Sequence, residues 1–196
     1  MNEKELRKLL KQLEGAKLEF KSQMYQLEGQ GRKTQWTELI KDIIALANGN
    51  LGTANEVGYL IIGASDQLGE DGIREIYDVG EVNLTQKQLL DKIGSFCITP
   101  LQDLNVETIP IDGKRIFIIT IPPSDYLHEL EKPLQTKTWE FSEGSVLLRR
   151  IDGEKIYKAN DEERSRIRKE KQKWLHTRNH GSICSSTRLR LLKAKL

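Results

Sequence analysis

Residues 58–63 read Gly-Tyr-Leu-Ile-Ile-Gly, a continuous apolar run between two glycines. Such a run is too short for a stable helix and is typical of a strand that is buried on both faces of a sheet. We therefore expect a central strand at residues 59–63. Ala64, Ser65 and Asp66 follow it, which places an acidic side chain near the carboxyl end of the strand.

Periodic patterns surround this strand. Apolar side chains recur at helical spacing in three segments, and alternation with a period of two marks one further segment. The predicted elements are helices at 2–14, 34–47 and 84–97 and a strand at 17–21. In that strand Glu19 falls on the polar side.

Two Asp-Gly pairs predict hairpin turns, because both central residues of a type I′ turn need positive φ. The predicted hairpins are 106–110 with 114–121, around Asp112-Gly113, and 145–151 with 154–157, around Asp152-Gly153. Helices and strands mix without strict βαβ repetition, so the fold class is α+β. We expect a mixed, mostly antiparallel sheet covered by helices.

Charge is distributed unevenly along the 196 residues. The net charge is +2, yet residues 161–196 carry 11 basic and 4 acidic side chains, which leaves residues 1–160 at −5. We expect one domain at 1–160, a charged helix at 161–174 and a basic, disordered tail at 175–196.

Several function classes are excluded by missing motifs. Cys97 and Cys184 are 87 positions apart without clustered histidines, which disfavours a disulfide framework and a structural zinc site. No apolar run approaches the roughly 18 residues of a membrane helix, and no P-loop or G-x-S-x-G motif occurs. These features favour a cytoplasmic protein with no membrane association.

Three acidic residues could meet in the fold. Glu14 ends the first predicted helix, Glu19 lies on the next strand, and Asp66 follows the central strand. Clustered carboxylates persist most readily around a divalent cation such as Mg²⁺ or Mn²⁺, which would polarise a phosphodiester and activate a water. The alternative is that all three are solvated surface acids.

Basic residues are candidates for phosphate contacts, which position a nucleic acid without reading its sequence. They are Lys21, Arg32, Lys33, Arg149, Arg150 and Lys158. The alternative is an ordinary solvated face. Trp36 and Trp139 are interpreted as core or rim packing rather than as platforms for bases.

Several short motifs follow one another in a characteristic order. They are Glu14-x4-Glu19-Phe20-Lys21, Ala45-Leu46-Ala47-Asn48, Gly58 to Gly63 with Asp66, Ile98-Thr99-Pro100, Ile119 to Ser124, and Leu148-Arg149-Arg150 with Lys158-Ala159. In this order they resemble the Schlafen AlbA-type (AlbA-like) domain, a family described as DNA-binding. The resemblance covers about residues 6–170.

The resemblance implies an α+β module that binds nucleic acid, in bacterial regulators and in Schlafen proteins. In some animal members a Glu-x4-Glu pair and a later Asp form the metal site of an RNA-cleaving nuclease, and these positions correspond to Glu14, Glu19 and Asp66. The sequence departs from the family at 48–58, where the usual Asn-Thr-x-Gly-Gly segment is replaced. Schlafen nucleases close a groove with two lobes, so a single lobe would need a homodimer.

Three hypotheses follow. The leading one is a DNA- or RNA-binding protein in regulation or defence that needs no cofactor for binding. The second is a metal-dependent endoribonuclease or endonuclease, with Mg or Mn held by Glu14, Glu19 and Asp66 and with Lys21 stabilising charge on the phosphate. The third is a protein-interaction module that docks a partner through the basic helix at residues 164–173.

Overall fold

A four-stranded sheet forms the centre of the molecule. The computed structural model describes the backbone of residues 1–193 and the side chains of residues 1–177. The strand order is β1-β2-β6-β5, where β1 pairs parallel with β2 and the other two pairs are antiparallel. These strands are β1 (Leu18–Lys21), β2 (Gly58–Ile62), β6 (Lys114–Ile121) and β5 (Asn105–Ile111). The predicted central strand and the mixed, mostly antiparallel sheet are confirmed.

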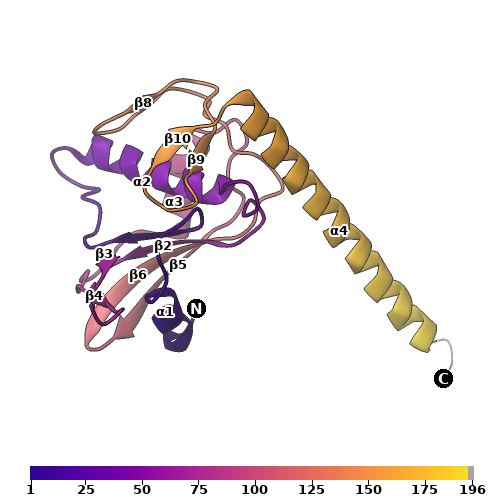
Figure 1. The fold of residues 1–196 in the computed structure, drawn as a ribbon, viewed down its shortest axis with the longest axis horizontal. Coiled ribbons are helices and arrows are strands. Elements are labelled where there is room, and N and C mark those ends of the chain that lie inside the picture. The colour runs from indigo at the N-terminus through magenta and orange to yellow at the C-terminus, as the bar shows by residue number, and fades with distance from the viewer. Residues whose placement is uncertain (194–196) are drawn as a thin grey trace.

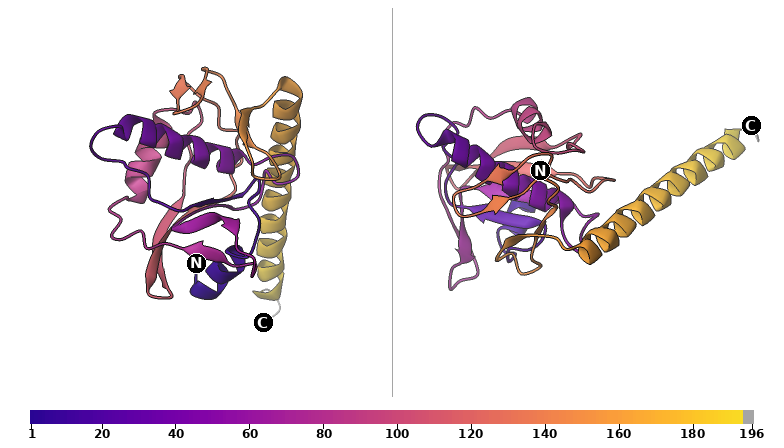
Figure 2. Two further views of the ribbon diagram at one scale, coloured as in Figure 1. Left: turned by 60° about the vertical axis from the view of Figure 1, so that its left-hand side comes forward. Right: turned by 90° about the horizontal axis from the view of Figure 1, so that it is seen from above.

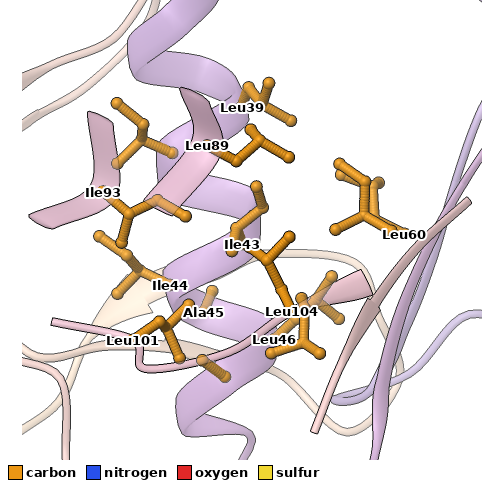
Figure 3. Packing of buried hydrophobic residues seen from close by; sticks show 14 of the residues in the cluster. Leu39, Ile43, Ile44, Ala45, Leu46, Leu60, Leu89, Ile93, Leu101 and Leu104 are labelled. Carbon is orange, nitrogen blue, oxygen red and sulfur yellow. The ribbon is translucent and has the colours of Figure 1, made fainter. Parts of the chain in front are cut away.

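Helices cover both faces of this sheet (Figure 1). Helices α2 (Arg32–Asn48) and α3 (Gln86–Gly94) lie on one face and α1 (Glu3–Leu9) lies on the other. Side chains along β2 point alternately to the two faces of the sheet. Leu60 and Ile62 pack in the cluster of α2 and α3, and Ile61 packs in the cluster of α1. Figure 3 shows the larger cluster, with α2 and α3 packed together beside Leu60.

Short strands complete the fold around the sheet. They are β3 (Ala64–Leu68) with β4 (Arg74–Ile76), β7 (Leu134–Gln135) with β8 (Glu140–Phe141), and β9 (Leu147–Arg149) with β10 (Ile156–Lys158). Each pair is an antiparallel ribbon. The β9–β10 ribbon packs against α2 and therefore covers the same face of the sheet.

The two Asp-Gly turns differ. Asp112 and Gly113 have φ values of 50° and 75°, which confirms the tight turn between β5 and β6. Around Asp152 the prediction of a two-residue turn is wrong, because β9 ends at Arg149 and β10 begins at Ile156. The Asp152 carboxylate instead accepts hydrogen bonds from Arg150 Nε and Glu154 N within a longer loop.

Helix α4 (Asp161–Lys193) leads away from the rest of the molecule (Figures 1 and 2). The predicted helix at 161–174 is present, but it continues to residue 193, where the sequence predicted an irregular tail. The segment 175–193 contains no proline, the residue that would interrupt a helix most strongly. Residues 194–196 lie outside the described part. Among the described residues, no helix is both long and apolar enough to cross a membrane.

Buried donors hold the carboxyl end of α2. Asn48 Nδ2 donates to the carbonyls of His128 and Leu147 at 2.9 and 3.0 Å, and its Oδ1 accepts from His128 N at 2.8 Å. Lys17 Nζ donates to Leu46 O at 2.7 Å. The Lys17 bond satisfies a carbonyl that the helix end leaves unpaired, whereas the Asn48 bonds connect the last residue of α2 to the backbone at His128 and Leu147. They join α2 to β1 and β9.

A second lysine connects α4 to the same place. Lys171 is buried, and its Nζ donates to the carbonyl oxygens of Ala54 at 3.2 Å and Ser124 at 2.9 Å. Glu170, the preceding residue, accepts hydrogen bonds from Gly52 N and Ala54 N. The start of α4 is therefore bound to the loop that follows α2.

Asn48→Ala should destabilise the fold by about 2–4 kcal/mol, because it leaves one N–H and two carbonyls buried without partners. Urea unfolding measures the change. Asn83→Ala, at an exposed asparagine, is the control and should shift the free energy of unfolding by less than about 0.5 kcal/mol. Equal effects of the two substitutions would contradict this role of Asn48.

His128 predicts a pH dependence. Its side chain is buried, Nδ1 lies 2.6 Å from Thr99 O, and burial with the nearby charges of Lys171 and Lys17 lowers its pKa from 6.5 to about 4. Between these values the unfolded chain binds more protons than the folded one, so stability rises with pH there and is lost as pH falls. Between pH 7 and pH 4 the free energy of unfolding should fall by about 3 kcal/mol more in the wild type than in His128→Gln. If the free energy of unfolding changes with pH in the same way in both proteins, the buried His128 is not the cause of the pH dependence.

Candidate functional site

The three predicted carboxylates line one pocket. Its volume is about 630 Å³, and it lies where the segment after α1, strand β1 and strand β3 meet the β9–β10 ribbon. Glu14, Glu19 and Asp66 border it from these three segments. The pocket is also lined by Lys21, Lys41, Asp42, Trp139, Phe141, Arg149, Glu154 and Lys155. The fold thus brings the three acids to one place.

Glu19 is buried, with 3 % of its surface exposed. The predicted solvated side of β1 is wrong, because α2 and β9 cover the face to which Glu19 points. Its carboxylate forms ion pairs with Lys21 and with Arg149. Burial and the Asp42 carboxylate raise the pKa of Glu19 to about 7, against the opposing effect of the two cations.

Glu14 is held by the same arginine. Its Oε1 accepts a hydrogen bond from Phe20 N at 2.8 Å, and its Oε2 lies 3.3 Å from Arg149 Nη2. Arg149 Nε also donates to Gly15 O at 3.1 Å. Gly153 sits so close that a Cβ there would lie 2.6 Å from Glu14 Cβ, so glycine is required at this contact. Arg149 is thus enclosed by its own chain.

This donor set does not fit a divalent cation. The Glu19 carboxylate is paired with Lys21 and Arg149. The Glu14 carboxylate contacts Arg149 and accepts a hydrogen bond from the backbone N–H of Phe20. Asp66 is exposed. In the described part of the chain, no three His, Cys, Asp or Glu residues are arranged to hold a metal. Side-chain cations take the place that the metal hypothesis assigned to Mg²⁺ or Mn²⁺.

The six predicted phosphate contacts are not one patch. Arg149 is buried, which corrects the expectation that it lies on a solvated face. Lys21 borders the carboxylate pocket, and Lys158 borders a neighbouring pocket. Arg150 is exposed and pairs with Asp152 at 2.8 Å. Arg32 and Lys33 lie apart from these four, at the start of α2.

Arg32 and Lys33 are exposed in the first turn of α2. Gly31, with φ of 80°, precedes them, and no side chain caps this helix end within the described structure. Helix α2 therefore begins two residues before the predicted start at residue 34 and includes both cations. This terminus presents unpaired backbone N–H groups and two cationic side chains to solvent.

Asp42 is a site residue that sequence reasoning missed. It is buried on α2, accepts a hydrogen bond from Tyr25 Oη at 2.5 Å, and lies 3.3 Å from Lys41 Nζ. Its position among the buried apolar residues of α2 was the available signal, because an unpaired carboxylate is rarely buried. Asp42 adds a further negative charge beside Glu19.

Arg149→Met should cost about 3–5 kcal/mol of stability, because it leaves Glu19 buried without its arginine. Arg150→Met, at the adjacent exposed arginine, is the matched control, with an expected change below about 0.5 kcal/mol. The double variant Glu19→Gln with Arg149→Met should recover part of the loss. Chemical unfolding of the three variants measures this, and equal effects of the two single substitutions would refute the internal role of Arg149.

Comparisons with known proteins agree with the sequence resemblance. The family model described as Schlafen, AlbA_2 matches residues 14–173. No curated protein matches the chain. Solved structures similar to it include the N-terminal domain of a RecG-related protein from Nitrosomonas europaea, with 21% identity, a TM-score of 0.45, and coverage of 74% of this chain and 87% of that one. Another is the DIP2311 protein from Corynebacterium diphtheriae, with 15% identity, a TM-score of 0.42, and coverage of 74% and 25%. Since the family model spans most of its length, the chain belongs to the Schlafen AlbA_2 family.

Proposed function

We propose that this protein binds nucleic acid through its phosphate backbone, with the amino end of α2 as a principal contact. The proposal is supported by membership of the Schlafen AlbA_2 family and by one local observation, the open amino end of α2 beside Arg32 and Lys33. A backbone-directed contact of this kind would act on DNA or RNA without reading sequence.

The charges at this helix end oppose its dipole. The amino end of a helix carries partial positive charge, so acidic residues are favourable in the first turn and cations are unfavourable. Helix α2 has no acidic residue there and has Arg32 and Lys33 instead, with no capping side chain in the described structure. A bound phosphate would satisfy the free N–H groups and neutralise both cations.

Helix α4 offers a second basic surface. Arg166, Lys169 and Lys173 are exposed and, with His176, line a pocket of about 630 Å³ beside Leu51 and Gly52. In residues 161–196 the basic side chains outnumber the acidic ones by seven. This surface would add electrostatic attraction for a polyanion.

The test is fluorescence anisotropy with single- and double-stranded probes at increasing salt. The double variant Arg32→Gln with Lys33→Gln should weaken binding roughly 10-fold or more near 0.1 M salt. It should also flatten the plot of log K against log salt, by about 1.8 for a duplex probe and by about 1.4 for a single strand, or about 0.9 and about 0.7 for each lost phosphate contact. Lys4→Gln with Lys8→Gln removes the same charge from α1 and should leave the slope unchanged. Absence of binding by the wild type at about 50 mM salt would refute the function.

Two controls separate the remaining hypotheses. Truncation after residue 177 keeps the contacts of Ile167, Glu170 and Lys171 and removes five basic residues. Binding that vanishes with this truncation would belong to a nonspecific basic arm. Cleavage of the probe in the presence of Mn²⁺ that is abolished by Glu19→Gln would instead favour the nuclease hypothesis. Sedimentation of the same samples tests whether the protein is a homodimer.

A further inference from the structure

Trp139 presents an unusually open aromatic surface. Its exposed fraction is 56 %, which is high for a tryptophan, since most bury much of their surface. It lies at the end of the turn between β7 and β8. This position differs from the core or rim packing that the sequence suggested.

The backbone around Trp139 is fixed despite this exposure. Thr136, which is buried, accepts a hydrogen bond from Trp139 N at 3.0 Å and donates from its hydroxyl to Trp139 O at 2.8 Å. Thr136 N also donates to Trp139 O at 2.8 Å. The indole is therefore held outward by a closed turn, which lowers the entropy that a ligand would have to remove.

Two pockets meet at Trp139. One is the carboxylate pocket, and the other has a volume of about 490 Å³ and is lined by Phe141, Tyr157, Lys155 and Lys158 among others. The two share Trp139, Phe141, Lys155 and Ile156. We call this continuous surface the Trp139 groove. Lys155 Nζ lies 5.4 Å from the centroid of the indole ring.

The turn is also attached to α2. Thr37 Oγ1 donates to Gln135 O at 2.6 Å, and Lys137 N donates to Glu38 Oε1 at 2.7 Å. These contacts lie on α2 about one turn beyond Arg32 and Lys33. The turn that carries Trp139 is therefore joined to the helix to whose amino end we assign phosphate contacts.

Charge within the groove favours a polyanion at one side. The half-buried Glu14 and the buried Glu19 form ion pairs with Lys21 and Arg149, which weakens their repulsion of a polyanion. Lys155 and Lys158 border the second pocket together with one acidic residue, Glu140, so this side carries a small excess of positive charge. Asp66 and Glu154 border the opposite, carboxylate side.

We infer that Trp139 stacks on an unpaired base of a single-stranded nucleic acid whose adjacent phosphates contact Lys155 and Lys158. Every base has a π-face, but only an unpaired one can leave its neighbours to lie against a protein aromatic ring. A lysine beside the ring supplies the phosphate contact at the same nucleotide. This inference rests on the proposed function and adds that the bound nucleic acid is single-stranded.

Trp139→Ala should weaken binding to a 20-nucleotide oligo-dT or oligo-U about 5- to 150-fold, the range for loss of one stacked base, and leave a duplex of the same length unaffected. Trp139→Phe should retain most of the affinity because a ring remains. Tyr126→Ala, at a tyrosine that is 58 % exposed and borders neither pocket, is the matched control and should change nothing. The DNA and RNA probes show which sugar is accepted.

The outcomes separate this inference from the proposed function. If the wild type binds neither single strands nor duplex, the proposed function fails. If it binds but Trp139→Ala weakens neither probe, or weakens both equally, only the stacking inference is overturned. An oligo of abasic sugar-phosphate should bind the wild type as weakly as oligo-dT binds Trp139→Ala, and equal affinity of the wild type for the abasic and dT probes would overturn stacking without any variant.

Discussion

The carbonyl groups at the end of α2 set a constraint that the other elements meet. A buried helix end must find hydrogen-bond donors inside the protein, because water cannot reach it. Lys17, which immediately precedes β1, donates to the carbonyls of Leu46 and Ala47, and Asn48, the last residue of α2, binds the backbone of β9 at Leu147. Lys171 brings α4 to the same region. One local requirement thus fixes how β1, β9 and α4 lie relative to α2.

This placement determines the chemistry of the carboxylate pocket. Once β1 and β9 are held against α2, Glu19 and Arg149 face each other away from water, and burial of either charge alone would be costly. Lys21 and Glu14 complete a balanced set. The pocket therefore carries internal ion pairs, and its donor atoms are committed to side chains of the same chain rather than open to a metal.

Local patterns predicted the parts of the fold that depend on neighbouring residues. The run at 58–63 indicated the central strand, and Asp112-Gly113 indicated its turn, because apolar continuity and positive φ are properties of a few adjacent residues. The burial of Glu19 could not be predicted in this way, since it depends on β9, which lies 128 to 130 positions later. The longer loop at Asp152 likewise depends on its packing against Glu14.

The two ends of α2 differ in whether their backbone groups find partners within the protein. Donors from several elements satisfy its carboxyl end, whereas its amino end has a glycine where serine or aspartate would stabilise it, followed by two cations that the helix dipole disfavours. A helix anchored so firmly at one end tolerates this cost at the other. Local rules are most often violated at functional sites, where a ligand supplies the missing partner. The unfavourable end of α2 and the outward Trp139 are two such violations, and contacts at Thr37 and Glu38 join the turn that carries Trp139 to the same helix.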